Sequence, residues 1–513
     1  MNETARNAPR SELLPNDPYD AELLAHARPP GWTNPTPARR YNLVVLGAGT
    51  AGLVTAAGAA ALGAKVALVE KNLLGGDCLN FGCVPSKALL RSARFYADLR
   101  DAARFTGSVL APSEADFAAA MERMRRLRAR ISHHDSVKRL RDLGVDVFLG
   151  EATFVDRRRV EVAGATLTFK KAVVATGSHA AHPAIDGLEE AGYQTNETIF
   201  DLTERPRRLL VVGGGPLGCE LAQAFSRLGC EVTIASQEPY FLPGEERDAA
   251  EILADSLRRD GIDVRLNTQV KSVTREGGEK RARLIDYDQD TTVAMDEILV
   301  GVGRIPNVLG LNLEAAGVLF DQENGVRVND YLQTANRNVY AAGDVAVERK
   351  YTHMADATAR IVIQNALFWG RKKLSSLTIP WCTYTDPEIA HVGVYVKEAR
   401  EQGFGMKTFT VPMSEVDRAV LDGEEEGFVK IHVREGSDTI LGATIVARHA
   451  GEMINEISLA MVAGIGLKTV SQVIHSYPTQ AEAIRKAGDA YNRTRLPPFL
   501  KAISRRWLAW SRG

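Results

Sequence analysis

The chain has 513 residues, and its 63 basic and 64 acidic side chains leave a formal net charge of −1. A charge so close to zero excludes the strongly basic class of nucleic-acid-binding proteins, so we expect no nucleic-acid partner. Five cysteines in so long a chain exclude a small disulfide scaffold, and with no signal peptide and no apolar run of about 18 residues we expect a cytoplasmic protein without a membrane span.

The first 40 residues are rich in Pro, Asn, Ala and Arg and show no sustained hydrophobic period. This composition predicts an extended or disordered leader. Regular structure is expected to begin at Tyr41, where an apolar strand is followed by a tight glycine turn, a helix of small residues and a second strand.

That first unit carries a dinucleotide-binding pattern. Gly47, Gly49 and Gly52 directly follow the strand and fit the turn, the close approach of a pyrophosphate and the packing of helix on strand. Glu70 ends the second strand, where a carboxylate can hold ribose hydroxyls. Because strand, helix and terminal acid are all present, we interpret the unit as a nucleotide site and not as a chance glycine turn.

A cysteine pair follows within GGDCLNFGCVPSKALL, residues 75–90. Cys78 and Cys83 stand at a spacing from which a helical turn can close a strained disulfide, and such disulfides are the catalytic ones. A helix N-terminus and Lys87 would favour the thiolate. The alternatives are two buried thiols or a metal site, but zinc needs more ligands than cluster here, so we predict no resident metal. The remaining cysteines are most simply core residues: Cys219, Cys230 and Cys382.

A cationic helical stretch is expected at about 113–143. Its basic side chains are Arg123, Arg125, Arg126, Arg128 and Arg130. Charge runs of this kind usually form a solvated helix face, and we favour that interpretation over a binding patch.

The second nucleotide unit, residues 209–236, repeats the first with Gly213, Gly215 and Gly218. Its second strand ends at Ser236, so no acid occupies the place that Glu70 holds in the first unit. The lack of an acid slightly favours NADP over NAD, although no arginine follows to grip a 2′-phosphate.

The domain organisation follows from this repeat. Strand-and-glycine elements at 172–177 and 299–307 flank the second unit, which suggests that it is inserted into the first domain. After Ile379 the pattern changes to alternating strands and two helical stretches, which predicts an α+β domain. The predicted boundaries are a leader at 1–40, a first nucleotide domain at 41–195 and 296–375, a second at 196–295, an α+β domain at 376–495 and a tail at 496–513.

The tail could form a short helix after Pro497-Pro498. An apolar face would then contain Phe499, Leu500, Ile503, Trp507 and Trp510, and an opposite cationic face Lys501, Arg505 and Arg512. An aromatic face beside a cationic one is typical of interfacial helices. Weak contact with a membrane surface, peripheral to the inner membrane face, is one prediction; packing on a partner subunit or fraying is the alternative.

The ordered motifs resemble those of the class I pyridine nucleotide-disulfide oxidoreductases. GGDCLNFGCVPSK is similar to the redox-active segment of that family, and VVATG (173–177), VGRIPN (302–307) and AAGDV (341–345) follow in the family order across about residues 41–495. The resemblance implies an α/β fold with two Rossmann-like domains, one for FAD and an inserted one for NAD(P), plus a C-terminal α+β dimerisation domain, and hence a homodimer.

The resemblance also implies roles for individual residues. Cys83 would be the thiol against the flavin, Cys78 the interchange thiol, and Lys87 with Glu220 an ion pair near flavin and nicotinamide. Asp344 would hold the ribityl chain, and Met354, beside His353, would lie beneath the flavin ring. The other implied cofactor-binding residues are Gly47, Gly49, Gly52, Glu70, Gly76, Ala175, Thr176, Gly177, Gly213, Gly215, Gly218, Ser236, Gly303 and Arg304.

The sequence departs from the family at the base. Members that act on dithiols carry His-x-His-Pro with a later Glu, and the second His is the general base. Here the segment has His475, Tyr477 and Glu482, so a phenol with a pKa near 10 stands where the base should be. His475 could substitute, since residues two apart share a face in an extended segment, or it could be a packing histidine.

These residues predict an FAD-dependent NAD(P)H oxidoreductase that passes electrons through the Cys78–Cys83 disulfide. A Tyr at this place resembles mercuric reductase, although residues 1–40 and 496–513 contain no cysteine to hand a metal inward. The predicted acceptor is a small molecule or a metal ion. The alternatives are a dihydrolipoyl dehydrogenase with His475 as base, direct reduction of quinones or oxygen by the flavin, and a membrane-associated redox sensor or subunit.

Overall fold

The first βαβ unit forms as its sequence predicts in the computed structural model, which describes residues 13–107, 116–287, 289–403, 405–495 and 498–512. Its strand β1 (Tyr41–Leu46) leads into helix α3 (Thr50–Ala61) and strand β2 (Val66–Glu70). The chain divides into two units, of which the first comprises residues 1–239 and 260–377 and the second residues 240–259 and 378–513. Each unit is described by itself.

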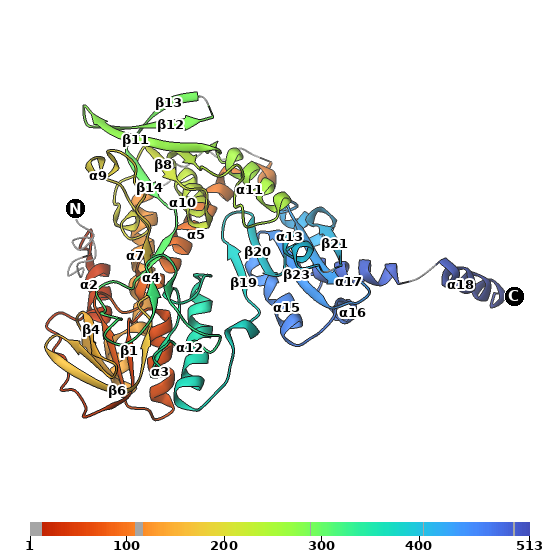
Figure 1. Cartoon of the computed structure of the whole chain (residues 1–513). Helices are drawn as coiled ribbons and strands as arrows, with labels where there is room; N and C mark the ends of the chain where they lie inside the picture. The colour runs from red at the N-terminus through yellow and green to blue at the C-terminus, as the bar shows by residue number, and fades with distance from the viewer. Residues whose placement is uncertain (1–12, 108–115, 288, 404, 496–497, 513) are drawn as a thin grey trace. The chain divides into compact units, whose positions relative to one another are not determined.

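A parallel sheet is the frame of the first unit (Figure 1). Its strands run in the order β3-β2-β1-β6, with β18 beside β6 and an antiparallel extension through β5 and β4. The strands not yet defined are β3 (Asp146–Leu149), β4 (Ala152–Asp156), β5 (Arg159–Val162), β6 (Ala165–Val174) and β18 (Val339–Ala341). Because side chains alternate along a strand, β1 packs Leu43 and Val45 into one core and Val44 and Leu46 into another.

The cysteine segment forms two consecutive helices, α4 (Gly76–Asn80) and α5 (Cys83–Arg100). Cys78 lies inside α4 and Cys83 is the first residue of α5, so the pair brackets the connection between them. The first unit also contains α6 (Ala103–Thr106), α7 (Phe117–Ser132), α8 (Val137–Asp142), α9 (Leu188–Ala191) and α12 (Thr352–Leu367), the last of which packs on α3.

The predicted extended or disordered leader is wrong for residues 13–27, whereas residues 28–40 contain no helix or strand and residues 1–12 lie outside the described part. Helix α2 (Pro18–Ala27) begins at a capping box in which the Asp17 side chain accepts from two backbone amides. Leu13, Leu23 and Ala27 are buried in the core of the first sheet. The cap and three well-spaced apolar residues suffice because a folded core is present to receive them.

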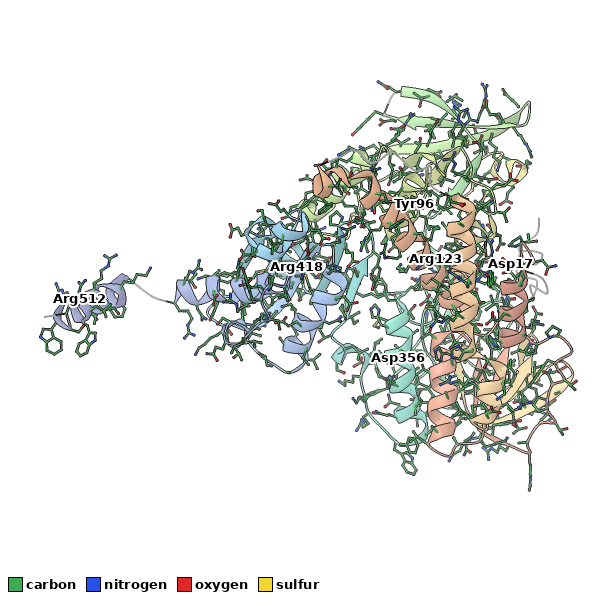
Figure 2. The ribbon with its side chains drawn as sticks, turned by 180° about the vertical axis from the view of Figure 1, so that it is seen from behind. Asp17, Tyr96, Arg123, Asp356, Arg418 and Arg512 are labelled. Carbon is green, nitrogen blue, oxygen red and sulfur yellow. The ribbon has the colours of Figure 1, made fainter. Side chains whose placement is uncertain are left out.

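The solvated-face interpretation of the cationic helix is also wrong for two of its arginines. On α7, Arg125 and Arg128 are buried, and each pairs with a carboxylate at the start of α2. Figure 2 shows Asp17 beside the helix that carries Arg123. The partners lie about one hundred positions upstream, at Asp17 and Asp20, so no local charge pattern could reveal them.

The second βαβ unit also forms as predicted. Strand β8 (Arg208–Val212), helix α10 (Pro216–Arg227) and strand β9 (Glu231–Ala235) build a parallel sheet in the order β10-β9-β8-β14. The outer strands are β10 (Asp263–Arg265) and β14 (Glu297–Val300), and an antiparallel sheet of β11 (Thr268–Glu276), β12 (Glu279–Asp286) and β13 (Gln289–Met295) lies between them in the sequence.

The inserted arrangement is confirmed by strand pairing. The chain leaves the first sheet through strand β7 (Ser178–Ala180) and returns through strand β15 (Arg304–Pro306). These two strands pair antiparallel with each other. Strand β18 then joins β6 in the first sheet. A short hairpin of β16 (Phe320–Asp321) and β17 (Gly325–Val326) precedes it. The exact domain boundaries stay predictions.

The second unit is built on an antiparallel sheet in the order β19-β20-β23-β22-β21. The strands are β19 (Pro380–Thr383), β20 (Glu388–Gly393), β21 (Met406–Pro412), β22 (Phe428–Arg434) and β23 (Ile440–Ala447). The helices are α11 (Arg247–Arg259), α13 (Val396–Glu401), α14 (Asp417–Asp422), α15 (Ala450–Val462), α16 (Leu467–Val470), α17 (Glu482–Thr494) and α18 (Pro498–Trp510). Among the described residues, no helix has the length and apolarity needed to cross a membrane.

Candidate active site

The first glycine turn is shaped for a phosphate group. Gly47 has φ +100°, and a Cβ there would collide with the carbonyl oxygen of Ala175. Gly76 approaches the same loop so closely that a Cβ would lie 2.5 Å from the Cα of Gly49. No side chain caps the N-terminus of α3, so no side-chain acceptor of the chain satisfies its first backbone amides. The turn therefore fits the pyrophosphate of a dinucleotide.

Glu70 lies at the predicted end of β2 and is buried. Its carboxylate accepts from the amide of Ala48 at 2.6 Å and from the amide of Asn72 at 2.7 Å. Burial raises the pKa of Glu70, and these two amide donors act against that rise. The side chain thus stands beside the turn, where the sequence pattern expects it.

A polar network joins the segment on which the chain leaves the first sheet to the segments on which it returns. Arg304 donates to the Ser178 hydroxyl at 2.8 Å and to the Ser178 carbonyl at 2.9 Å. Ser178 in turn donates to Asp344 at 2.7 Å. Thr176 and Asn307 exchange two further hydrogen bonds, at 2.7 and 2.8 Å. The predicted residues Thr176, Arg304 and Asp344 are therefore brought together.

Asp77, which the sequence reasoning did not single out, connects this network to the cysteines. It precedes Cys78 directly and lies 3.2 Å from the Arg304 guanidinium. Its carboxylate also accepts from the Asn196 amide at 2.8 Å. The carboxylate beside Cys78 was visible in the sequence, but only the fold reveals its cationic partner.

The two cysteines are thiols in this structure and differ in acidity. The hydrogen bond from the Cys78 thiol lowers the pKa of Cys83 to about 6, and Thr352 and Lys87 act in the same direction. The pKa of Cys78 is raised by the same hydrogen bond and by burial. The Thr352 hydroxyl, at the start of α12, lies 3.2 Å from the Cys83 sulfur. Cys83 is therefore the more acidic thiol of the pair.

Lys87 and Glu220 form the predicted ion pair, with 2.7 Å between Nζ and Oε2. Lys87 is one turn after Cys83 on α5, and Glu220 is buried on α10. Met354 is buried on α12, two residues after Thr352. The Lys87 ammonium thus lies one helical turn from Cys83, and its ion pair with Glu220 connects the first nucleotide-binding domain to the second.

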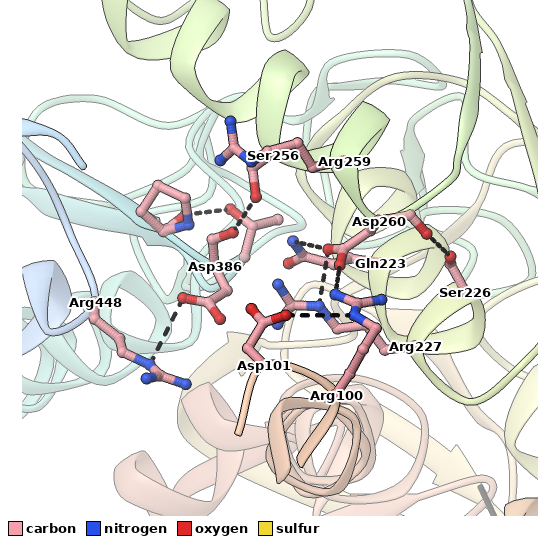
Figure 3. A network of polar contacts seen from close by, with 12 residues as sticks. Arg100, Asp101, Gln223, Ser226, Arg227, Ser256, Arg259, Asp260, Asp386 and Arg448 are labelled. Carbon is pink, nitrogen blue, oxygen red and sulfur yellow. Dashed lines mark hydrogen bonds and ion pairs between the residues drawn. The ribbon is translucent and has the colours of Figure 1, made fainter. Parts of the chain in front are cut away.

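One carboxylate fastens the same two helices further along (Figure 3). Asp260 accepts from Arg100 at the end of α5 at 2.7 Å, and from Gln223 and Arg227 of α10 at 3.0 and 2.8 Å. The Ser226 hydroxyl donates to the Asp260 carbonyl at 2.7 Å. The relative placement of α5 and α10 is therefore fixed by charge as well as by packing.

The second glycine turn resembles the first. Gly213 has φ +110° and lies against the Gly301 carbonyl, whereas a Cβ on Gly215 would meet open space. No side chain caps α10. Ser236 is buried at the end of β9, next to Arg265, whose guanidinium already pairs with Asp263 at 2.8 Å. A second dinucleotide phosphate fits here as well.

His475, Tyr477 and Glu482 belong to the segment in which the family carries its general base, and all three lie in the second unit. Tyr477 is exposed, and its hydroxyl donates to Asp417 at 2.9 Å. This hydrogen bond raises the pKa of Tyr477, so the phenol remains protonated at neutral pH. Asp417 was missed in the sequence because 60 positions separate it from Tyr477.

The His475 side chain is 7% exposed and lies against Glu456. Its Nε2 lies 3.0 Å from the Glu456 carboxylate, and its Nδ1 lies 3.1 Å from the Val473 carbonyl. Both ring nitrogens thus lie against oxygen acceptors of the same chain. Glu482 accepts from Arg485 at 2.7 Å, while its other carboxylate oxygen is buried without a hydrogen-bond partner.

Two uncapped dinucleotide turns, a thiol pair with one activated sulfur and a fixed Lys–Glu pair define a flavin- and nicotinamide-dependent redox protein. The residues fit FAD at the first turn and a nicotinamide nucleotide at the second. Among the described residues, no group of three His, Cys, Asp or Glu side chains is placed to hold a metal ion.

Comparison with known proteins identifies the family. Residues 41–360 match the pyridine nucleotide-disulphide oxidoreductase family, and residues 379–488 match its dimerisation domain. The chain belongs to the class I pyridine nucleotide-disulphide oxidoreductases, enzymes that use FAD and NAD(P)H, as the sequence predicts. The dimerisation domain supports a homodimer.

The relatives span several activities. The chain is 33% identical to a mercuric reductase of Staphylococcus aureus, over 88% of this chain and 83% of that protein. It is also 33% identical to a dihydrolipoyl dehydrogenase of Thermus scotoductus, over 89% and 98% of the two chains. The structure of the HOCl-induced flavoprotein disulfide reductase RclA from Escherichia coli matches with a TM-score of 0.79 and 27% identity, covering 88% of this chain and 99% of that chain.

Proposed function

We propose that this NAD(P)H- and FAD-dependent enzyme reduces a soft metal ion such as Hg(II) at the Cys78–Cys83 pair. FAD, when bound, supplies two-electron transfer from the nicotinamide to the disulfide. The net reaction is NAD(P)H plus Hg(II) giving NAD(P)⁺, Hg(0) and one proton. The name of the mercuric reductase relatives agrees with this acceptor.

The chain's own residues have distinct roles in this proposal. Cys83, with its lowered pKa, is the thiolate against the flavin, and Cys78, which keeps its proton longer, meets the acceptor. The Lys87–Glu220 pair holds a cation beside the cofactors. Glu70 and the network of Arg304 and Asp344 hold FAD, and Ser236 lies at the nicotinamide nucleotide.

The observation that carries the proposal is the absence of an available base at Tyr477 and His475. The Tyr477 phenol is engaged by Asp417, and both nitrogens of His475 face acceptors. A disulfide or dithiol substrate needs proton transfer at sulfur, which a positioned base assists. Reduction of a metal ion needs no proton transfer to the acceptor, so electron transfer through the two cysteines should be little affected by the missing base.

The ligand set supports a soft ion. Thiolates select soft metals, and zinc requires four ligands. Since no third His, Asp or Glu ligand joins the two thiols in the described part of the chain, only an ion satisfied by two sulfurs fits.

An acceptor screen tests the proposal. We expect NAD(P)H oxidation with Hg(II) to exceed that with lipoamide, glutathione disulfide and quinones, and to be lost in Cys78→Ala. If Cys78→Ala leaves every productive acceptor unchanged, the thiols are bypassed and the flavin reduces its acceptor directly. Slow turnover with all acceptors, together with redox-dependent capture of a protein partner, would instead indicate a redox sensor.

Dihydrolipoyl dehydrogenase activity is the second candidate, because the His475–Glu456 contact provides a histidine beside a carboxylate. Rapid oxidation of dihydrolipoamide by NAD that collapses in His475→Ala would establish it. His475→Gln is the matched control, since it keeps a polar side chain without a titratable base.

For the nicotinamide cofactor we propose NADPH over NADH. Ser236 presents no negative charge to a 2′-phosphate, although Arg265 is held by Asp263. Comparing kcat/KM for the two cofactors tests this preference, and a Ser236→Glu variant should shift it toward NADH.

We also propose that the tail contacts anionic lipid. In α18, Phe499, Ile503, Trp507 and Trp510 are exposed. The helix and its end carry four cations and no acid: Lys501, Arg505, Arg506 and Arg512. Apolar area beside positive charge is complementary to an acidic bilayer surface.

Vesicle co-sedimentation tests the tail. We expect the full chain to pellet with phosphatidylglycerol vesicles more than with phosphatidylcholine vesicles, and a Trp507→Ser/Trp510→Ser double variant to stay in solution. Equal pelleting of the full chain and a chain ending at residue 496 would overturn this proposal.

A further inference from the structure

The segment before the family match is part of the folded first unit. The match begins at residue 41, yet α2 lies upstream of it with a capped N-terminus. Its residues Leu23 and Ala27 are buried in the core. The Arg28 side chain donates to the carbonyls of Lys71 and Asn72, at 2.9 and 2.7 Å. This chain therefore adds an element to the frame that surrounds the cofactor turn.

A buried ion pair links that element to α7. The Arg128 guanidinium donates to the Asp20 carboxylate at 2.9 Å, and both side chains are 1% exposed. Asp20 is held in turn by the backbone amides of Asn16 and Asp17. A buried charge without its partner is strongly unfavourable, so Asp20 fixes the position of the guanidinium.

The same guanidinium reaches the redox segment. Its second terminal nitrogen donates to the backbone carbonyl of Asn80 at 3.0 Å. Asn80 ends α4, between Cys78 and Cys83, where helix carbonyls lack intrahelical partners. The next carbonyl, of Phe81, accepts from the Asn196 side chain at 3.2 Å. Two consecutive backbone carbonyls between the cysteines are thus each held by a different side chain.

We propose that Arg128, held in place by Asp20, is a positioning residue that sets the geometry of the Cys78–Cys83 pair. The N-terminal segment then takes part in redox chemistry without touching the cofactor or the acceptor. The proposal rests on the proposed role of the cysteines. Without the hydrogen bond to Asn80, the connection between α4 and α5 keeps only the bond from Asn196 to Phe81, so it can shift and the contact between the two thiols loosens.

Reactivity of Cys83 reports this geometry directly. In the reduced FAD-loaded protein, alkylation by iodoacetamide, mapped by peptide mass spectrometry across pH, gives the midpoint at which Cys83 becomes a thiolate. We expect Arg128→Met to raise this midpoint by about half to one pH unit, since the hydrogen bond from Cys78 is weakened. Turnover with Hg(II) should fall by about tenfold or more, because small misplacements at a reacting centre are costly.

Two comparisons separate positioning from general stability. Arg125→Met is the matched control, since it breaks the neighbouring ion pair with Asp17, and the hydrogen bond that it removes goes to Asp17 and not to the cysteine segment. It should leave the Cys83 midpoint unchanged. Ferricyanide, which takes electrons from the flavin without the thiols, should be reduced by Arg128→Met at the rate of the unmodified chain. Asp20→Asn should fall between the unmodified chain and Arg128→Met.

The outcomes are decisive. An unchanged midpoint in Arg128→Met, or equal shifts in Arg128→Met and Arg125→Met, would overturn the proposal. If Arg128→Met does not fold, Arg128→Lys takes its place. Lysine keeps the positive charge but lacks the two guanidinium nitrogens that donate to Asp20 and to the Asn80 carbonyl at the same time. Failure of the cysteine roles themselves would appear separately, as undiminished Hg(II) turnover in Cys78→Ala.

Discussion

The Thr352 hydroxyl is a second polar neighbour of the Cys83 sulfur, so it should affect how the reactivity of Cys83 depends on pH. The thiolate is the reactive form, so reactivity of Cys83 in the reduced protein should rise as the pH rises through about 6 and then level off. Thr352→Val removes the hydroxyl at 3.2 Å and should move this rise to higher pH. Thr352→Ser keeps the hydroxyl and should not. Identical profiles for both variants would show that Thr352 does not stabilise the thiolate.

Tyr477 offers a gain-of-function experiment. Tyr477→His places a base where the family has one, and the buried free oxygen of Glu482 is available to orient it. We expect dihydrolipoamide oxidation to increase about tenfold or more, since general bases contribute about 10²–10⁴. Tyr477→Phe is the control and should show no gain. A Tyr477→His chain without added activity would mean that the missing base does not limit the choice of acceptor.

Individual residues were predictable where a short motif defines them. The two glycine turns each follow a strand, and Cys78 and Cys83 stand within one continuous redox motif of the sequence. Asp77, Thr352, Asp417 and Glu456 were not, because each acts through a partner far away along the chain. A carboxylate or hydroxyl becomes informative only when the fold supplies what it bonds to.

At the level of elements, α5 and α10 are joined at Asp260 as well as at Lys87–Glu220. Asp260→Asn removes the negative charge that Arg100 and Arg227 share and should cost about 3 kcal/mol, since the Asp260 and Arg227 side chains are buried. We expect a clearly lower Tm in thermal unfolding. Asp255→Asn removes an exposed pair with Arg258 and should change Tm little. Equal effects of both substitutions would contradict a structural role for Asp260.

The elements themselves were predicted best where hydrophobic periodicity is strong. Both βαβ units, β1 with α3 and β8 with α10, lie where their patterns indicate. Helix α2 was missed because its composition matches that of a linker and its stability comes from burial against α7. The arginines of α7 were misjudged for the same reason: their burial depends on α2.

For the whole molecule, the dimerisation domain predicts an active site shared between two chains. In mixed dimers of a Tyr477→His chain and a Cys78→Ala chain, no site would then combine the new histidine with Cys78. The gained dihydrolipoamide activity should therefore fall in proportion to the mixed-dimer fraction. Activity that stays with the Tyr477→His chain would place both groups in one subunit. Light scattering at the working concentration establishes that dimers are present.

The pairing of β7 with β15 has a consequence for the mechanics of the chain. The insert leaves and returns on two strands that face each other from Ser178 to Ala180 and from Arg304 to Pro306, so its two ends are one strand spacing apart. Because the ladder at the base of the insert already fixes its two ends, local unfolding of the insert needs its contacts with α5 to break but needs no strand of the FAD-binding sheet to separate. A different nucleotide-binding domain joined at the same two strands would likewise leave the parent sheet intact.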